Sequence, residues 1–452
     1  MVKPDKQLGE IPKSKEAYEQ TLKIATPAVA EMVSMALLAM VDMIMVAGLG
    51  SAAIAAVGLT AQPRMIFFAV FFAMNVAATA IIARYKGTGD KDAARSCLRH
   101  SILIGLFAGL LMTFLAIVLA RPMMMLAGAT DTTLDLSASY FRIAGFGIVF
   151  AALSQIICSA QRATGNTKIT MKVNMTANVV KVAANFLLIP ILGVDGAAVS
   201  LVITNVLAFI LAAISLVPKD SYLRIAITDK WNINKQMLKT IGRQTSGGMI
   251  EQLALRIGFF LYARVVADLG DFQVAVHHIA MQLMNLSFTF ADGIAIATTS
   301  LVGQNLGKKR ADLSRMFGQI GLRLAFIVAV CLSILVIIFR FQFPAMFATG
   351  DDAAAIIEAT AGIMIILAII LPFQTTQLVM GGSLRGAGDT RYVAVTMLLT
   401  VGFIRPLTGY LFAFELGLGL AGAWFAIIVD QIARLVLLYV RFIRGKWTTV
   451  KI

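Results

Sequence analysis

The chain has 452 residues, of which 59% are hydrophobic and only 14% are charged. Soluble globular domains contain about 25% charged residues, so this composition argues against a soluble enzyme or binding domain and for a membrane protein. The formal net charge of +15 would suggest a nucleic acid partner in a soluble protein, but here the cations lie in connections between apolar segments, and we expect no nucleic acid partner.

Twelve apolar segments follow one another along the chain. Each is long enough to cross roughly 30 Å of hydrocarbon as a helix, and all are too long and too uniformly apolar for barrel strands. Because lipid offers no hydrogen-bond partner to the backbone, the segments must satisfy their own amide groups, as helices do. We therefore predict an all-α, polytopic membrane protein. The predicted transmembrane helices lie near 22–48, 52–83, 96–119, 136–161, 168–190, 196–217, 242–267, 273–305, 316–340, 355–383, 392–413 and 420–443.

Lysine and arginine concentrate in alternate connections, such as 84–95 and 308–310. The short turns between them, such as Gly48–Ser51 and Leu269–Asp271, contain neither residue. Cytoplasmic loops carry the excess of cations in membrane proteins, so both termini are predicted to lie in the cytoplasm of a multi-pass protein of the inner (plasma) membrane. The first helix is expected to stay as an anchor rather than to be cleaved as a signal peptide.

The two halves of the sequence repeat each other in nearly one register, with charged and glycine positions among the matches. The matched positions are Glu31 with Glu251, QRATGNTK (161–168) with LRGAGDTR (384–391), Lys181 with Arg405, and Gly193 and Gly196 with Gly419 and Gly422. A parallel repeat of this kind is one of the ways in which transporters enclose a central site.

The repeat divides the chain into two pseudo-symmetric lobes of six helices each. We predict an N-lobe over 1–217, a cytoplasmic linker over 218–240 and a C-lobe over 241–452. The polar composition of the connection that begins at Pro218 places the boundary there.

Several motifs resemble the MATE family of multidrug and toxin extrusion antiporters, and a DinF-like subtype is one option within it. They are LRGAGDT (384–390), its twin RATGNT (162–167), LVGQNLG (301–307), and Pro27 followed by Asp42. The resemblance implies two six-helix lobes around a cavity, and export of organic, often cationic, compounds driven by a proton or sodium gradient. The sequence shows no nucleophile–base pair and no metal-ligand spacing, so we expect no enzyme, no metal site and no cofactor besides the coupling ion.

Ionisable residues inside predicted helices are the first candidates for ion coupling, because a charge at hydrocarbon depth is costly. Asp42, Glu31 and Glu251 are the candidates. Asp42 and Glu31 are eleven residues apart, about three helical turns, and so share one helix face. In the resembled family the position of Asp42 binds the coupling ion or a proton, and Glu251 matches the acidic C-lobe residue. A helix-holding hydrogen bond would explain Glu31 equally well.

The fifth predicted helix carries a polar stripe that includes an unexpected cation. Asn174, Asn178, Lys181 and Asn185 follow one another at spacings of four, three and four residues, which places them on one face. Many relatives in the resembled family have asparagine where Lys181 stands and aspartate where Asn185 stands. Lys181 and Asp42 are interpreted either as an exchangeable pair or as a structural one. Thr204 resembles a family position near the same site.

The second half departs from the sodium-coupled pattern of the resembled family. Ile370 and Gln374 occupy positions where such relatives carry tyrosine and aspartate, so the interpretation favours protons over sodium. The eighth predicted helix has a second polar stripe, which is either a wet cavity wall or a set of helix–helix hydrogen bonds. Its members are His278, Gln282, Asn285, Thr289 and Asp292. Asp430 and Arg434 are expected to form a structural ion pair at i, i+4, and Arg405 is expected to be structural.

Composition and periodicity predict a secondary transporter, and the resemblance to the MATE family implies a secondary active antiporter. It is expected to export small organic, mainly cationic, compounds in exchange for protons, with sodium as the other option, and to work as a monomer in contact with membrane lipid. The alternative is a lipid-linked oligosaccharide flippase of a distantly related fold. Lys181 and Arg405, two cations within predicted helices, favour it mildly.

Overall fold

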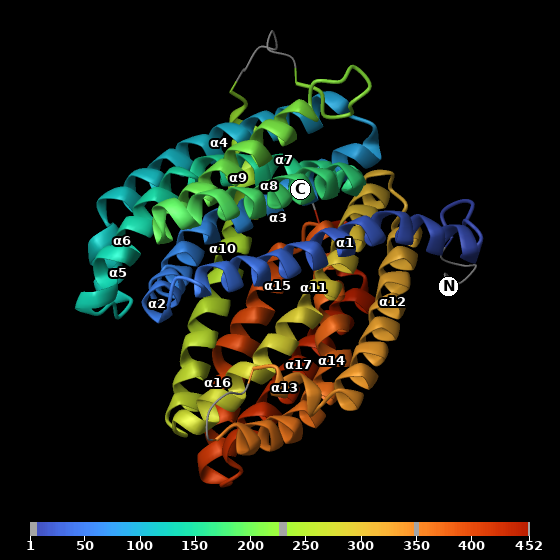
Figure 1. Ribbon diagram of the computed structural model, residues 1–452. Coiled ribbons are helices and arrows are strands. Elements are labelled where there is room, and N and C mark those ends of the chain that lie inside the picture. Colours follow the sequence, from blue (N-terminus) through green and yellow to red (C-terminus); the bar gives the residue numbers. More distant parts are fainter. Residues whose placement is uncertain (1–6, 226–232, 348–351, 451–452) are drawn as a thin grey trace. The chain divides into compact units, whose positions relative to one another are not determined.

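The computed structural model describes residues 7–225, 233–347 and 352–450, and all regular structure in these ranges is helical (Figure 1). By their internal contacts the residues form two units. Unit 1 comprises Met1–Val29 and Ser246–Ile452, and unit 2 comprises Ala30–Thr245. The segment before Ala30 therefore groups with the second half of the chain, which differs from the expected N-lobe of 1–217. Residues 226–232 of the expected linker lie outside the described ranges.

Unit 2 contains the second part of α1 and eight further helices, and in Figure 1 they run from blue to green. The helices are α1 Ser14–Ala47, α2 Ser51–Leu59, α3 Ala61–Thr88, α4 Lys91–Val118, α5 Ala120–Leu126, α6 Asp131–Phe146, α7 Ile148–Ala163, α8 Thr167–Leu192 and α9 Val194–Ile214. One segment expected as a single helix over 136–161 is two helices, α6 and α7, bent by 48° at Gly147. The helix α9 approaches closely here, because a β-carbon at Gly147 would lie 2.7 Å from the side-chain nitrogen of Asn205 and 3.5 Å from Cα of Val202.

Helices in unit 2 pack through small residues and turn large ones outward. On α4, Gly105 and Gly109 are buried, whereas Phe107 and Phe114 are 70% and 62% exposed. A β-carbon at Gly105 would lie 2.2 Å from Cδ1 of Ile156 in α7. This is the arrangement of a membrane protein, in which close backbone approach stabilises helix pairs and large apolar side chains face lipid.

Unit 1 contains the start of α1, which is blue in Figure 1, and the remaining helices, which run from yellow-green to red. They are α10 Lys235–Ala267, α11 Asp271–Gly307, α12 Ala311–Ile338, α13 Gln342–Ala345, α14 Ala353–Gly386, α15 Thr390–Met397, α16 Arg405–Tyr410, α17 Gly419–Arg444 and the 3₁₀ turn η4 Lys446–Thr449. The part of α10 before Ser246 belongs to unit 2. The core around Trp424 joins α10, α11, α14 and α17.

The start of α1 is anchored within unit 1. Ala17 and Ile24 are buried in a cluster with Leu301 of α11 and Phe317 of α12. Before the helix, the amide of Leu8 donates to Oδ2 of Asp312 (3.1 Å). The local contacts of α1 therefore change along its length, and its start packs with α11 and α12, which belong to the other half of the sequence.

The helix that the sequence predicts over 392–413 is interrupted by two π-helical segments. These are η2, Leu398–Ile404, and η3, Leu411–Glu415, and they lie on either side of α16. Pro406 has no amide hydrogen, so it cannot donate to the carbonyl of Gly402 as an α-helical residue would. Gly258 in α10 lies against η2, where a β-carbon would come within 2.2 Å of the Val401 carbonyl oxygen. π-Bulges often mark functional positions, and Arg405 directly follows the π-helical segment η2.

Ten helices in the described part of the chain are long and apolar enough to cross a membrane, or eleven if α6 and α7 count as one span. The twelfth expected span is α10, which is not among these helices. It is 33 residues long, but it carries the charged residues Glu251, Arg256 and Arg264. The all-α polytopic architecture predicted from the sequence is confirmed.

Candidate coupling and substrate site

Glu31 of α1 is buried and fully hydrogen-bonded within unit 2. Its Oε1 accepts from Nη1 of Arg162 in α7 (3.1 Å) and from Nδ2 of Asn174 in α8 (2.7 Å). Its Oε2 accepts from the hydroxyl of Thr170, also in α8 (2.7 Å). A buried carboxylate with three donors, one of them charged, is well compensated, so Glu31 ties three helices together.

Glu251 of α10 occupies the repeated position in unit 1 but has fewer partners. Nη2 of Arg385 lies 3.2 Å from Oε1 of Glu251, an ion pair that corresponds in the repeat to the pair of Glu31 and Arg162. Oε2 is buried and has no hydrogen-bond partner among the described residues. The reason lies in the sequence, because the register that matches the two glycine-containing motifs puts Val393 and Met397 where α8 has its two donors.

Asp42, farther along α1, forms an ion pair with Lys181 of α8. Its other carboxylate oxygen accepts from Nδ2 of Asn185 (2.8 Å). The side chains of Asp42 and Lys181 are each 19% exposed, so this pair is only partly buried. The structure thus joins these three members of the predicted site.

Two other residues of the predicted site bind elsewhere. Nδ2 of Asn178 donates to the carbonyl of Asn174, and the hydroxyl of Thr204 donates to the carbonyl of Ser200, one helical turn back in each case. Such local bonds satisfy a polar side chain without joining a neighbouring helix. Neither residue contributes a hydrogen bond to Asp42.

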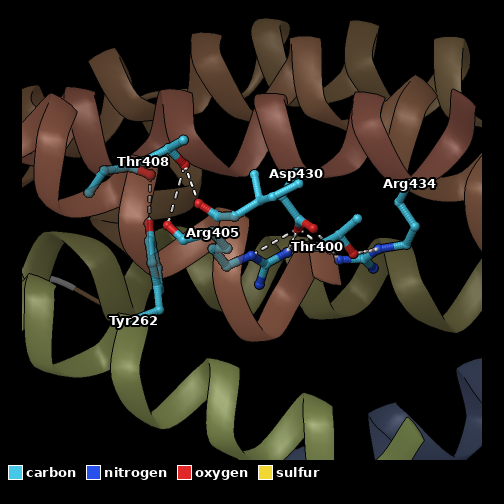
Figure 2. Close-up of polar contacts among 8 residues, drawn as sticks. Tyr262, Thr400, Arg405, Thr408, Asp430 and Arg434 are labelled. Carbon is cyan, nitrogen blue, oxygen red and sulfur yellow. Dashed lines mark hydrogen bonds and ion pairs between the residues drawn. The ribbon is translucent and has the colours of Figure 1, made fainter. Parts of the chain in front are cut away.

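The cation that corresponds to Lys181 in unit 1 is Arg405, and it has a different counter-ion (Figure 2). Nε of Arg405 donates to Oδ2 of Asp430 in α17 (2.9 Å), and Nη2 of Arg434 donates to both oxygens of the same carboxylate (2.7 Å each). Nε of Arg434 also donates to the hydroxyl of Thr400 (3.1 Å). The three charged side chains are at most 4% exposed. The expected pair of Asp430 and Arg434 is confirmed, and Arg405 joins it.

The repeat explains why the two halves differ here. In the register that matches the first helices of the two halves, Asp42 corresponds to Tyr262. In the register that matches the last helices, Thr204 corresponds to Asp430. The acidic partner of the fifth-helix cation therefore lies on the first helix in one half and on the last helix in the other. Tyr262 remains close, because its ring centre lies 5.8 Å from the Arg405 guanidinium. Aligning the two halves residue by residue is the sequence signal that could have identified the partner of Arg405.

The polar stripe of α11 lies on an exposed face. His278, Gln282, Asn285 and Asp292 are all exposed. Gln374 of α14 is not part of this face, because it is fully buried and its Nε2 donates to the hydroxyl of Ser287 (2.9 Å). Gln374 is also a candidate for the substrate cavity from the sequence, and the structure places it apart from the exposed face of α11.

Comparison with known proteins decides the family. The MatE family model matches residues 27–187 and, a second time, residues 249–411, so that it covers both halves of the repeat. The chain belongs to the MATE family. Family members are transporters rather than enzymes, which confirms the prediction that this protein is not an enzyme. The chain is a multi-pass membrane transporter of small molecules.

Two relatives illustrate how far the MATE similarity extends. The chain is 28% identical over 417 residues to the uncharacterized transporter YisQ of Bacillus subtilis, with 90% of each chain covered. It is 26% identical over 445 residues to a probable multidrug resistance protein, NorM, of Thermotoga maritima, with 96% of this chain and 93% of that one covered. The name of the second relative, which spans almost the whole chain, refers to multidrug resistance.

Solved MATE structures share the fold. A MATE transporter in complex with MaL6 superposes with a TM-score of 0.88 at 23% identity, covering 95% of this chain and 96% of that one. A MOP superfamily transporter from Pyrococcus furiosus superposes with a TM-score of 0.89 at 22% identity, covering 97% and 98%. These similarities confirm the MATE fold over nearly the full length.

Proposed function

We propose that this MATE transporter is a secondary active antiporter that exports organic compounds carrying a cationic group in exchange for protons. The observation that supports this most strongly is the half-paired carboxylate of Glu251. Its buried Oε2 lacks a partner among the described residues, whereas the equivalent oxygen of Glu31 is bonded to Thr170. An ionised oxygen without a donor is costly away from water. Taking up a proton removes that cost, and releasing it restores the ion pair with Arg385.

The surroundings of Glu251 suit a proton better than a sodium ion. Hard metal cations need several oxygen ligands, whereas a proton needs one lone pair. The guanidinium of Arg385 lies 3.2 Å from Glu251, and Arg434 interacts with it electrostatically as a second positive charge. A further metal cation would be repelled by both. We therefore propose H⁺ as the coupling ion.

The proposed orientation follows from the charges of the connections. Both termini and the cation-rich loops are placed on the cytoplasmic side of the inner (plasma) membrane. The transporter is proposed to act as a monomer, with its exposed apolar side chains in contact with lipid. The similarity to MATE transporters over nearly the full length does not favour the flippase alternative.

The test is transport by the purified full-length protein in vesicles. Vesicles with an acidic interior are mixed with ethidium or Nε-dansyl-lysine, and accumulation of each probe is followed by fluorescence. We expect accumulation of at least one probe to depend on the pH gradient and to be lost in Glu251→Gln. Glu358→Gln makes the same chemical change at an exposed position of α14 and should leave transport unchanged. Transport driven by a sodium gradient without a pH gradient, or full activity of Glu251→Gln, would refute the proposal.

A further inference from the structure

The polar cluster around Asp42 contains more positive than negative charge. Lys181 of α8 is its direct partner. Tyr140 of α6 lies within electrostatic range of both Asp42 and Arg64 of α3, so a second cation adjoins the cluster. With Asp42 and both cations ionised, the formal charge of the cluster is +1. Tyr140 adds no charge while its hydroxyl is protonated.

A simple organic cation fits this cluster poorly. To reach Asp42 it must displace the ammonium of Lys181, which would then lose its counter-ion beside a second positive charge. A simple anion has the complementary difficulty, since it would take Lys181 and leave Asp42 without its ion pair. A molecule that carries both charges replaces the two halves of the pair at once and leaves the charge of the cluster unchanged.

The hydrogen-bonding groups are arranged for the same kind of ligand. Asn185 donates to Asp42 through Nδ2, but its Oδ1 is buried and has no partner among the described residues. This acceptor without a partner lies on the same side chain that donates to Asp42. An ammonium group has three N–H donors, so it can donate both to the Asp42 carboxylate and to Asn185 Oδ1. On the other side, the ammonium of Lys181 is itself a donor for a carboxylate.

Accessibility separates this pair from its counterpart in unit 1. The side chains of Asp42 and Lys181 are each 19% exposed, whereas those of Arg405 and Asp430 are 2% and 0% exposed. Arg405 and Arg434 together hold Asp430, so exchange of that carboxylate would leave two buried guanidinium groups unpaired. Of these two charge clusters, the one in unit 2 is therefore able to exchange partners with a ligand.

We propose that the cluster of Asp42, Lys181 and Asn185 binds a zwitterionic group, with the ligand ammonium on Asp42 and Asn185 Oδ1 and the ligand carboxylate on Lys181. This assignment rests on the proposed transport function and specifies its substrate class. A proton and the ligand ammonium compete for Asp42. The other charged or titratable groups of the cluster are Lys181, Arg64 and Tyr140. Such competition is what exchange of cargo for protons requires.

The experiment compares three probes that share one fluorophore. Nε-dansyl-lysine is a zwitterion, its methyl ester is a cation, and its Nα-acetyl derivative is an anion. Binding to the purified full-length protein is measured by dansyl fluorescence at about pH 6, where the free ammonium groups are protonated. We expect the zwitterion to bind at least about tenfold more tightly than either of the other probes, since each lost charge removes a charge-assisted hydrogen bond.

Variants assign the two ends of the probe. In Lys181→Gln the advantage of the zwitterion over the ester should fall to about onefold, and in Asp42→Asn its advantage over the acetyl derivative should fall likewise. Lys172→Gln, an exposed lysine of the same helix, should keep both preferences. The wild-type comparison decides the question even if a variant fails to fold.

Binding of the ester or of the acetyl derivative as tightly as the zwitterion would overturn the assignment, and so would absence of binding by all three probes. Accumulation of ethidium driven by a pH gradient would in that case still support the proposed antiport. The two proposals can therefore fail separately.

Discussion

The buried charge cluster of unit 1 gives the sharpest stability prediction. Asp430 is the shared acceptor of two guanidinium groups, those of Arg405 and Arg434, and none of the three side chains is more than 4% exposed. Asp430→Asn keeps the size of the side chain but leaves two positive charges without a counter-ion. Breaking a buried ion pair in this way costs about 3–5 kcal/mol. We expect a loss of this size in the free energy of unfolding.

Two further variants separate the charge effect from general damage. Arg405→Met removes one cation but leaves the neutral pair of Asp430 and Arg434, so its loss should be clearly smaller than that of Asp430→Asn. Asp135→Asn breaks an exposed pair with Arg121, whose side chains are 55% (Arg121) and 78% (Asp135) exposed, and should cost about 0–1 kcal/mol.

The assay is unfolding of the purified protein in mixed micelles, followed by tryptophan fluorescence against denaturant. A free energy of unfolding for Asp430→Asn within about 0.5 kcal/mol of the wild-type value would refute the reasoning. So would a larger loss in Arg405→Met than in Asp430→Asn, because the shared carboxylate would then not be the critical partner.

Two other predictions compare equivalent positions of the repeat. Glu251→Gln should abolish transport, whereas Glu31→Gln should mainly lower the free energy of unfolding. The loss in Glu31→Gln should be about 1–3 kcal/mol and larger than that in Glu251→Gln, because it weakens an acceptor of three donors rather than of one; equal effects on both measurements would contradict this distinction. Gly196→Ala and Gly422→Ala should each destabilise the protein, because the new methyl group would meet a backbone carbonyl oxygen, that of Leu188 at 2.3 Å and that of Phe412 at 2.5 Å. Gly362→Ala is the control, because a β-carbon at Gly362 has no other atom within 4 Å. Unchanged thermal unfolding in all three variants would contradict the prediction and would show that the backbone adjusts freely.

Some of the site was predictable because it is local or repeated. Asp430 and Arg434 are one helical turn apart, so their pairing follows from helix geometry alone. Glu31 and Glu251 were matched by the repeat, and the structure places an arginine from the matching motif beside each. The contacts of Glu31 with Thr170 and Asn174 of α8 had to be seen first. Once they are known, the register of the repeat explains why Val393 and Met397 leave Glu251 with fewer donors.

Other features depend on which helices pack together. Lys181 and Asp42 are far apart in the sequence, and whether they pair is decided by the contact of α8 with α1. The break at Gly147 and the burial of Gln374 likewise follow from neighbouring helices rather than from the residues before and after them. Helical periodicity gives the face of a residue but not the helix that the face meets.

The sequence by itself determined that the chain is an all-α membrane protein built from two similar halves, with carboxylates at a few positions inside the spanning helices. It could do so because lipid imposes the same length and the same backbone hydrogen bonding on every spanning segment, whatever the others do. Only the tertiary structure decided which carboxylate is left half-paired, where the counter-ion of each fifth-helix cation lies, and that α1 begins in one unit and ends in the other. These outcomes depend on close approach between helices distant in the sequence, and small residues such as Gly105 and Gly258 permit it at positions that no local pattern marks.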